Sequence, residues 1–264
     1  MARLPCRGRH GGLPSAGPGT ILAVILDVDG TVATCPYDFD GMRAAVTRVA
    51  AKWGVDAADL PVRGIIERIA LIAEMLREQG GGGRGQEMNS CPTGGGEEFR
   101  TEAEQAVREL EVAAAETACL LPGAAEALAR LRQHGLKLGL ITRNCRAAAE
   151  RVLSDLHGYD VLLTREDVPD AKPHPDHVVR AAAALDCRPN QVAVVGDHAF
   201  DIQAGRAAGA CVCIGVRTGG SPDASLREVG ADVILDSLAD LPNWLLPVRR
   251  GGGGAPQVGN LRCG

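Results

Sequence analysis

Short apolar segments typical of buried strands recur along the chain, and segments with helical spacing of apolar residues separate them. The predicted strands cover residues 21–27, 136–142, 159–164, 191–197, 211–216 and 231–235. The predicted helices between them cover residues 122–134, 146–157, 176–185 and 200–208. Strands that are apolar throughout and alternate with helices are typical of a parallel sheet covered on both faces. The pattern therefore predicts an α/β fold.

The alternation breaks between residues 36 and 119. Apolar residues recur there at helical spacing over residues 42–53, 62–76 and 99–118, and no strand signal is present. We expect a helical module, inserted after the first strand, that could cover the carboxyl ends of the strands, where such sheets bind ligands. Its glycine-rich segment, residues 80–96, lacks a phosphate-loop motif and is interpreted as a flexible insert.

Glycine and proline account for 34 and 15 of the 264 residues, and we assign this excess to tails and inserts. Residues 1–20 are basic and contain no acid; we interpret them as a disordered tail, with an organelle transit segment as the alternative. A second disordered tail is expected over residues 247–264. The predicted core then comprises residues 21–35 and 120–246, and the helical cap comprises residues 36–119.

Charge and cysteine content narrow the class of protein. The formal net charge of −5 gives no support for binding to nucleic acid, and the longest apolar run, residues 21–26, is too short to cross a membrane. The nine cysteines have no zinc-site or C-x-x-C spacing, so we interpret them as reduced thiols of an intracellular protein. A disulfide between Cys35 and Cys145 is the alternative. A cytoplasmic or organellar location and the oligomeric state are left open.

Two carboxylates stand at the end of the first predicted strand, in the motif D-V-D-G-T over residues 27–31. Asp27 and Asp29 are two residues apart, so in an extended chain their side chains point to the same side. Carboxylates this close repel each other unless a cation lies between them. An ordinary turn at Asp29 and Gly30 is the alternative interpretation.

Polar motifs also follow three later strands. Thr142, in I-T-R-N, could donate a hydrogen bond to an anion, or Thr142 or Asn144 could cap the next helix. Lys172, in A-K-P-H-P, could neutralise a phosphoryl oxygen or be a solvated loop residue. Asp197 and Asp201, in G-D-H-A-F-D, are one helical turn apart; they could bind a cation or only cap the following helix. Together these residues supply the groups that phosphoryl transfer needs.

The ordered set D-x-D-G-T, Thr, Lys-Pro and G-D-x-x-x-D resembles that of the haloacid dehalogenase-like superfamily, on its phosphatase branch. Within that branch the chain is similar to phosphoglycolate phosphatase-like proteins with a small helical cap, over residues 21–245. The resemblance implies a Rossmann-like, doubly wound parallel sheet with an inserted α-helical cap. It also implies that Asp27 is a nucleophile forming an aspartyl-phosphate, that Asp29 is the acid and base, and that Thr142 and Lys172 bind the phosphoryl group.

The same resemblance implies Mg²⁺ as the cofactor. Its expected ligands are Asp27, Asp197 and the backbone carbonyl of Asp29, with Asp201 supporting the site. Hard oxygen ligands of this kind suit Mg²⁺, which also offsets repulsion between a nucleophilic carboxylate and an anionic substrate. The implied activity is Mg²⁺-dependent hydrolysis of a small phosphorylated metabolite. The alternatives are a phosphomutase of the same superfamily and a non-catalytic relative that binds a phosphorylated ligand or a partner protein.

Several neighbouring residues have two interpretations. Arg143 and Asn144 are candidate substrate contacts, but Arg143 could equally face solvent. His198 could assist proton transfer, although a supporting or solvent-facing role is favoured. The segment 37–40, Tyr-Asp-Phe-Asp, could contact substrate, but packing or capping of the following helix is favoured.

Overall fold

The computed structural model describes residues 20–58, 60–61, 64–81 and 95–246. Six parallel strands form one sheet in the spatial order β5-β4-β1-β6-β7-β8. Their bounds are β1 (Ala23–Asp27), β4 (Lys137–Ile141), β5 (Val161–Leu163), β6 (Val192–Gly196), β7 (Val212–Val216) and β8 (Val233–Leu235). The predicted α/β fold with a parallel sheet is confirmed.

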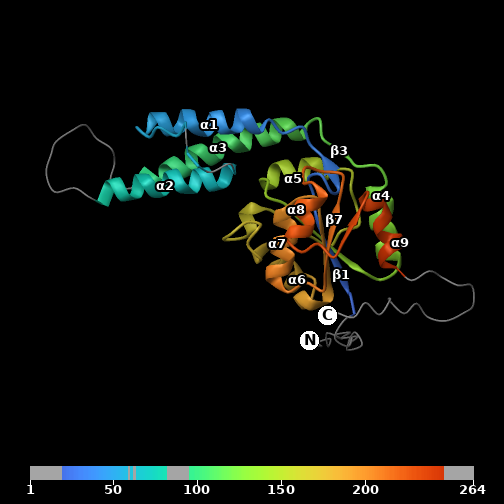
Figure 1. Ribbon diagram of the computed structural model, residues 1–264. Helices are drawn as coiled ribbons and strands as arrows, with labels where there is room; N and C mark the ends of the chain where they lie inside the picture. The colour runs from blue at the N-terminus through green and yellow to red at the C-terminus, as the bar shows by residue number, and fades with distance from the viewer. Residues whose placement is uncertain (1–19, 59, 62–63, 82–94, 247–264) are drawn as a thin grey trace, which may run out of the picture.

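Helices cover both faces of this sheet (Figure 1). One face carries α4 (Ala124–Gln133), α5 (Arg146–Val152) and α9 (Leu241–Leu245). The opposite face carries α6 (Asp176–Ala184), α7 (Ala199–Ala208) and α8 (Asp223–Glu228). Three short 3₁₀ helices complete the core, namely η1 (Arg165–Asp167), η2 (Pro189–Gln191) and η3 (Leu238–Asp240).

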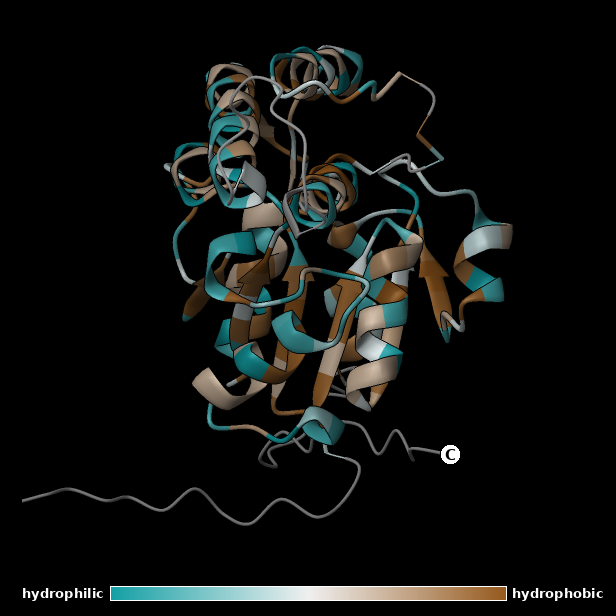
Figure 2. Ribbon diagram, turned by 90° about the vertical axis from the view of Figure 1, so that its left-hand side faces the viewer, coloured by the Kyte–Doolittle hydropathy of each residue, from teal (hydrophilic) through white to brown (hydrophobic). Residues whose placement is uncertain are grey.

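The alternation of side chains along β1 explains why the sheet needs helices on both faces. Val24 and Leu26 belong to the apolar cluster under α4 and α5, whereas Ala23 and Ile25 belong to the cluster under α6 and α7. All five residues of β1 are buried. Figure 2 shows the apolar strands enclosed by helices whose outer faces are polar.

The strand order creates a crevice beside β1. The chain moves outward from β1 to β4 and β5, and then crosses to β6 on the other side of β1 before reaching β7 and β8. Connections therefore leave β1 and β6 in opposite directions, which opens a crevice at their carboxyl ends. Asp27 is the last residue of β1, and Asp197 directly follows β6. The fold thus places two acids at the crevice.

Between β2 (Ala33–Thr34) and β3 (Cys119–Leu120) lie the helices α1 (Phe39–Lys52), α2 (Ile65–Gly81) and α3 (Gly95–Ala115). We call these helices the three-helix unit. They pack around an apolar cluster of their own that includes Ile72 and Phe99. Figure 1 shows the unit beyond α5, apart from the sheet. Because β2 and β3 pair antiparallel, the two connections between the unit and the core run side by side.

The sequence analysis found no strand signal in this part of the chain, yet two short strands, β2 and β3, lie at the two ends of the helical module. Each is only two residues long, so no alternating pattern could reveal it; their pairing depends on the folded position of the two connections. Helix α5 also ends earlier than predicted, at Val152 rather than residue 157, because the chain continues in tight turns. Leu153 and Leu156 remain buried in those turns, which preserves their apolar contribution to the pattern.

The glycine-rich insert predicted over residues 80–96 is partly helical, because α2 continues to Gly81 and α3 begins at Gly95. A Cβ on Gly95 would lie 2.8 Å from a ring carbon of Trp53. A Cβ on Gly96 would lie 2.5 Å from the carbonyl oxygen of Ala73. These glycines permit close approach between the helices, and they cost the helix only about 1 kcal/mol each relative to Ala. Residues 82–94 lie outside the described residues.

A nearly buried ion pair ties α3 to the core. Arg165 Nη1 lies 2.6 and 2.7 Å from the two carboxylate oxygens of Glu111, and the two side chains are 9% and 6% exposed. Glu111 also accepts a hydrogen bond of 3.1 Å from the backbone N–H of Cys145. Arg165 donates further to the carbonyl oxygen of Arg143. The end of α3 is thereby fastened to the loop that follows β4.

Cys145 is the N-cap of α5, and its Sγ accepts from the N–H of Ala148 at 3.4 Å. The alternative that Thr142 or Asn144 caps this helix is wrong: α5 begins at the predicted residue, Arg146, so the N-cap position falls on Cys145. Cys35 and Cys145 are both free thiols, so the alternative of a disulfide between them is wrong as well.

No helix among the described residues is long and apolar enough to cross a membrane. The predicted tails, residues 1–20 and 247–264, lie outside the described residues, apart from Thr20.

Candidate active site

Lys172 lies between two acids at the crevice. Its Nζ is 2.6 Å from Asp201 Oδ1 and also forms an ion pair with Asp27. All three side chains are buried, and they come from the loop before α6, from α7 and from the end of β1. Burial alone would lower the pKa of Lys172, but Asp201 and Asp27 raise it above its ordinary value. The lysine therefore remains a buried cation.

Asp197 brings a third buried carboxylate to this cluster. Its Oδ1 accepts from Thr31 Oγ1 at 3.2 Å, and its Oδ2 accepts from the backbone N–H of Gly220 at 3.0 Å. One carboxylate oxygen from each of Asp27, Asp197 and Asp201 lies within 4.8 Å of the others. Three acids thus surround one lysine.

The electrostatics of the cluster fit a divalent cation. Burial raises the pKa of Asp27 well above its usual range even though Lys172 opposes the shift, and the other acids raise it further. Burial also raises the pKa of Asp197, with Asp201 adding to the shift. An additional positive charge would offset this repulsion. Carboxylate oxygens are hard ligands of the kind that Mg²⁺ prefers.

Asp29 is held apart from this cluster by polar residues on β4's side of the crevice. Its Oδ2 accepts from Thr142 Oγ1 at 3.0 Å and from Asn144 Nδ2 at 2.6 Å. Its Oδ1 is buried and has no partner among the described residues. Burial raises the pKa of Asp29 to about 6, while hydrogen bonds from Thr142 and Tyr37 oppose the shift. A carboxyl with this pKa can give and take a proton near neutral pH.

The turn after β1 requires glycine. Gly30 has φ +84°, and a Cβ there would lie 2.7 Å from the Asp197 carboxylate. A Cβ on Gly219, in the loop after β7, would meet the same carboxylate at 1.8 Å. Thr218 Oγ1 in that loop donates to the carbonyl oxygen of Gly30 at 2.6 Å. This loop was not predicted, although R-T-G-G after an apolar strand is a usable signal.

The Arg143 side chain is only partly exposed and contacts two other residues. It forms an ion pair with Glu67 of α2, and its guanidinium carbon lies 5.1 Å from the centre of the Phe200 ring. Sequence reasoning missed both partners, because neither is near Arg143 in the chain. His198 is the N-cap of α7, and its backbone N–H donates to Asp201 Oδ2 at 3.0 Å. His198 is exposed, and its Nδ1 accepts from the N–H of Phe200, so the structure agrees with the supporting or solvent-facing role favoured for it.

Residues 37–40 have two interpretations, contact with substrate or packing and capping of the following helix, and different residues of the segment fit each. Asp38 is the N-cap of α1 and accepts from the N–H of Gly41 at 2.8 Å, whereas Phe39 is 56% exposed. Tyr37, in contrast, reaches the crevice, where Asn144 Nδ2 donates to its hydroxyl oxygen at 2.6 Å. Tyr37 therefore lies in the wall of the site, and Asp38 starts the three-helix unit.

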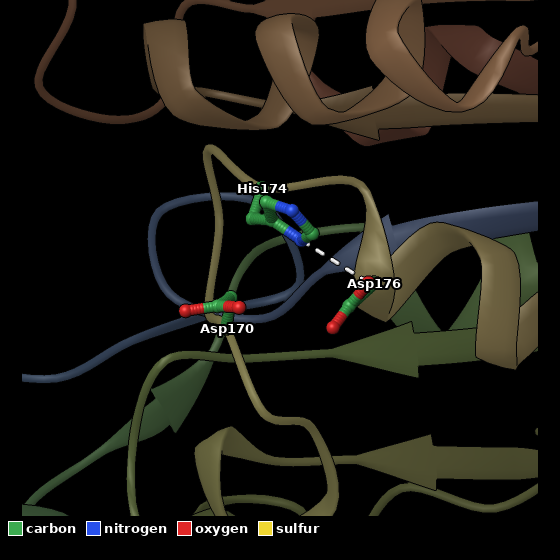
Figure 3. A group of neighbouring side chains, drawn as sticks. All are labelled: Asp170, His174 and Asp176. Carbon is green, nitrogen blue, oxygen red and sulfur yellow. Dashed lines mark ion pairs between the residues drawn. The ribbon is translucent and has the colours of Figure 1, made fainter.

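A second group of acids with a histidine lies on the surface of the loop that carries Lys172. Figure 3 shows Asp170, His174 and Asp176, in which His174 Nδ1 is 3.1 Å from Asp176 Oδ1. Asp170 and His174 are exposed, and Asp176 is half-buried. Exposed groups of this kind are common without an ion, so the buried cluster is the stronger candidate metal site.

A doubly wound parallel sheet with a helical insertion and an acidic crevice defines the Rossmann-like α/β class of enzymes. The family of haloacid dehalogenase-like hydrolases matches residues 21–209, so the chain belongs to that family and is a hydrolase.

Two curated relatives match nearly their full length. The plasmid-encoded phosphoglycolate phosphatase of Cupriavidus necator is 32% identical over 237 residues, which cover 86% of this chain and 94% of that protein. The phosphoglycolate phosphatase of Salmonella typhi is 32% identical over 239 residues, covering 84% and 91%. Both relatives are bacterial, so they give no support to the organellar alternative. The crystal structure of a hydrolase from Pseudomonas syringae is similar, with a TM-score of 0.56 and 25% identity, covering 84% of this chain and 96% of that one.

Proposed function

We propose that the protein is a Mg²⁺-dependent phosphatase that hydrolyses a small phosphorylated metabolite through an aspartyl-phosphate on Asp27. The observation that carries this proposal is the buried cluster at the carboxyl ends of β1 and β6, in which Lys172 lies between Asp27 and Asp201. Membership of a hydrolase family and two nearly full-length relatives named phosphoglycolate phosphatase support the reaction class.

In this proposal, Asp27, Asp197 and the backbone carbonyl of Asp29 would hold Mg²⁺, and Asp201 would support them. When bound, the ion would supply positive charge that offsets repulsion between the carboxylates and an anionic substrate. Asp201 has one oxygen on Lys172 and the other on the N–H of His198, so it fixes the position of the lysine. Lys172 in turn orients Asp27 and offers positive charge to the phosphoryl oxygens.

The carboxylate of Asp27 attacks phosphorus, and the bond to the leaving oxygen breaks. Asp29 gives its proton to that oxygen and then takes a proton from the water that hydrolyses the aspartyl-phosphate. Asp29 Oδ1 is the atom proposed for both transfers, because Oδ2 is already held by Thr142 and Asn144. The single O–H of Thr142 donates to Asp29 here, so it would have to turn away from that carboxylate to bind a phosphoryl oxygen of the substrate.

Phosphate release from a panel of phosphorylated metabolites, with Mg²⁺ and with chelator, tests the proposal. The panel contains phosphoglycolate, sugar phosphates, nucleoside monophosphates, pyridoxal phosphate and an aryl phosphate. We expect Mg²⁺-dependent release that falls by roughly a thousandfold or more in Asp27→Asn, because the nucleophile is lost. The variant Asp155→Asn, which changes an exposed acid, is the control and should keep full activity.

Release that persists in Asp27→Asn would contradict the aspartyl-phosphate. A folded wild-type protein that binds Mg²⁺ but releases no phosphate from any compound would contradict the phosphatase. That second result would favour the phosphomutase or the non-catalytic binder of a phosphorylated ligand.

A further inference from the structure

We propose that Arg143 is a specificity-determining residue that binds an anionic group on the alcohol portion of the substrate. Preferred substrates would then be small phosphomonoesters that carry a second negative charge. This inference rests on the proposed phosphatase function and deepens it.

Arg143 lies at the carboxyl end of the sheet, two residues beyond the end of β4. Arg143 follows β4, and its guanidinium lies over the ring of Phe200, in the first turn of the helix that follows β6. The strands β4 and β6 are the two neighbours of β1. The side chain therefore extends across the carboxyl end of β1, which ends at Asp27. A substrate whose phosphorus faces Asp27 would place its remaining atoms beside this guanidinium.

Arg143 already binds one anion, the carboxylate of Glu67. Its Nη2 donates to Oε1 of Glu67, in the first turn of α2. The other oxygen of Glu67 is buried and has no partner among the described residues. A guanidinium has five N–H donors arranged to match a carboxylate or a phosphate, and this one makes a single hydrogen bond within the described part of the chain. Donors therefore remain for a ligand anion.

Two other cations lie near this site in the described part of the chain, and each is bound to a buried acid of the protein. Lys172 is shared by Asp27 and Asp201, and Arg165 is bound to Glu111. Arg143 is only partly buried, and its counter-ion, Glu67, comes from the three-helix unit rather than from the core. A second anionic group of the substrate would compete with Glu67 for the guanidinium. A carboxylate and a second phosphate share the chemistry required.

A purely structural role for this ion pair makes a different prediction. If Arg143 and Glu67 only fasten α2 to the core, removal of either partner should affect every substrate in the same direction. If Arg143 binds the substrate anion, the two removals should have opposite effects on anionic substrates, because Glu67 is the competitor.

The test compares pairs of phosphomonoesters with the same carbon skeleton, in which one compound carries a second anionic group and its partner carries a hydroxyl there. Steady-state kinetics with Mg²⁺ are measured for 2-phosphoglycolate against 2-hydroxyethyl phosphate, and for 1,3-propanediol bisphosphate against 3-hydroxypropyl phosphate. The first pair tests a carboxylate, and the second tests a second phosphate. The proteins are wild type, Arg143→Gln, Glu67→Gln and the control Arg108→Gln. Arg108 also links the three-helix unit to the core, through an ion pair of 2.6 Å with Glu166.

For each pair we take the ratio of kcat/KM for the compound with a second anionic group over kcat/KM for its hydroxyl partner. We expect Arg143→Gln to lower this ratio by about tenfold or more in at least one pair, chiefly through KM. Glu67→Gln should raise that ratio, and Arg108→Gln should leave it unchanged. Equal losses for both members of each pair in Arg143→Gln would overturn the inference. A lower ratio in Glu67→Gln would overturn it too, in favour of the purely structural role.

Failure of the proposed function would be visible separately, as wild-type protein that hydrolyses neither these four compounds nor any compound of the panel above. Calorimetric binding of 2-phosphoglycolate and 2-hydroxyethyl phosphate to wild type and Arg143→Gln then decides the inference. The inference is supported if wild type binds 2-phosphoglycolate more tightly than 2-hydroxyethyl phosphate and Arg143→Gln does not. Equal affinities for the two compounds in the wild type would overturn it.

Discussion

Buried titratable side chains at the crevice depend on one another for their charge states. Lys172 keeps its proton because Asp27 and Asp201 lie against it, and Asp27 is costly to ionise in spite of Lys172. His177 responds to the same lysine from the first turn of α6. Its Nε2 lies 3.1 Å from the carbonyl oxygen of Thr164, and its Nδ1 is buried without a partner among the described residues.

The lowered pKa of the buried His177 side chain predicts that the stability of the fold depends on pH. Burial and the charge of Lys172 lower its pKa from 6.5 to about 4, with Asp167 and Arg143 as the other charged groups that act on it. The unfolded chain therefore takes up a proton as the pH falls below 6.5, whereas the folded chain does so only near pH 4. The free energy of unfolding should fall across this range, by up to about 3 kcal/mol from this group.

Urea unfolding of wild type and His177→Leu at pH 7 and pH 4.5 measures this effect. The loss of stability between the two pH values should be smaller in the variant, because leucine takes up no proton. Changes common to both proteins cancel in the comparison. An equal loss in both proteins would contradict the assignment.

At the scale of elements, close helix packing in the three-helix unit depends on glycine. A Cβ at Gly96 would lie 2.5 Å from the backbone oxygen of Ala73 in α2, which cannot move aside as a side chain could. Gly96→Ala should therefore lower the free energy of unfolding by about 1–3 kcal/mol, although alanine is the better helix former. Glu98→Ala, at an exposed position two residues further along α3, is the control and should change stability by less than about 0.5 kcal/mol. Greater stability of Gly96→Ala in urea would contradict the packing argument.

Most elements could be predicted because their signals are local. Apolar strands and amphipathic helices repeat along the chain, and parallel strands bring their carboxyl ends to one edge; this reasoning put Asp27, Thr142 and Asp197 in one region. The pairings around them could not be predicted in this way. Glu67 reaches Arg143 across 76 residues, and Gly220 reaches Asp197 from the loop after another strand. Such contacts depend on which loops face each other once the sheet has formed.

At the scale of the whole molecule, the buried acids predict that Mg²⁺ stabilises the fold. A ligand that binds only the folded state at 100 times its Kd raises the free energy of unfolding by about 2.7 kcal/mol. Thermal unfolding with and without Mg²⁺ should show a shift in Tm for wild type that is lost in Asp197→Asn, whereas Asp155→Asn keeps it. The same shift in Asp197→Asn would contradict the metal site. This readout is independent of catalysis.

The ion pair between Glu111 and Arg165 restricts how the three-helix unit can move relative to the sheet. Glu111 is less than two turns from the end of α3, yet it is fastened to η1 and to the loop after β4. That end of the helix therefore moves with the sheet. Any swing of α1 and α2 away from the crevice must bend α3 before Glu111 or separate two nearly buried charges. A motion of α1 and α2 that keeps this ion pair intact would therefore bend α3 itself, and would not turn about β2 and β3.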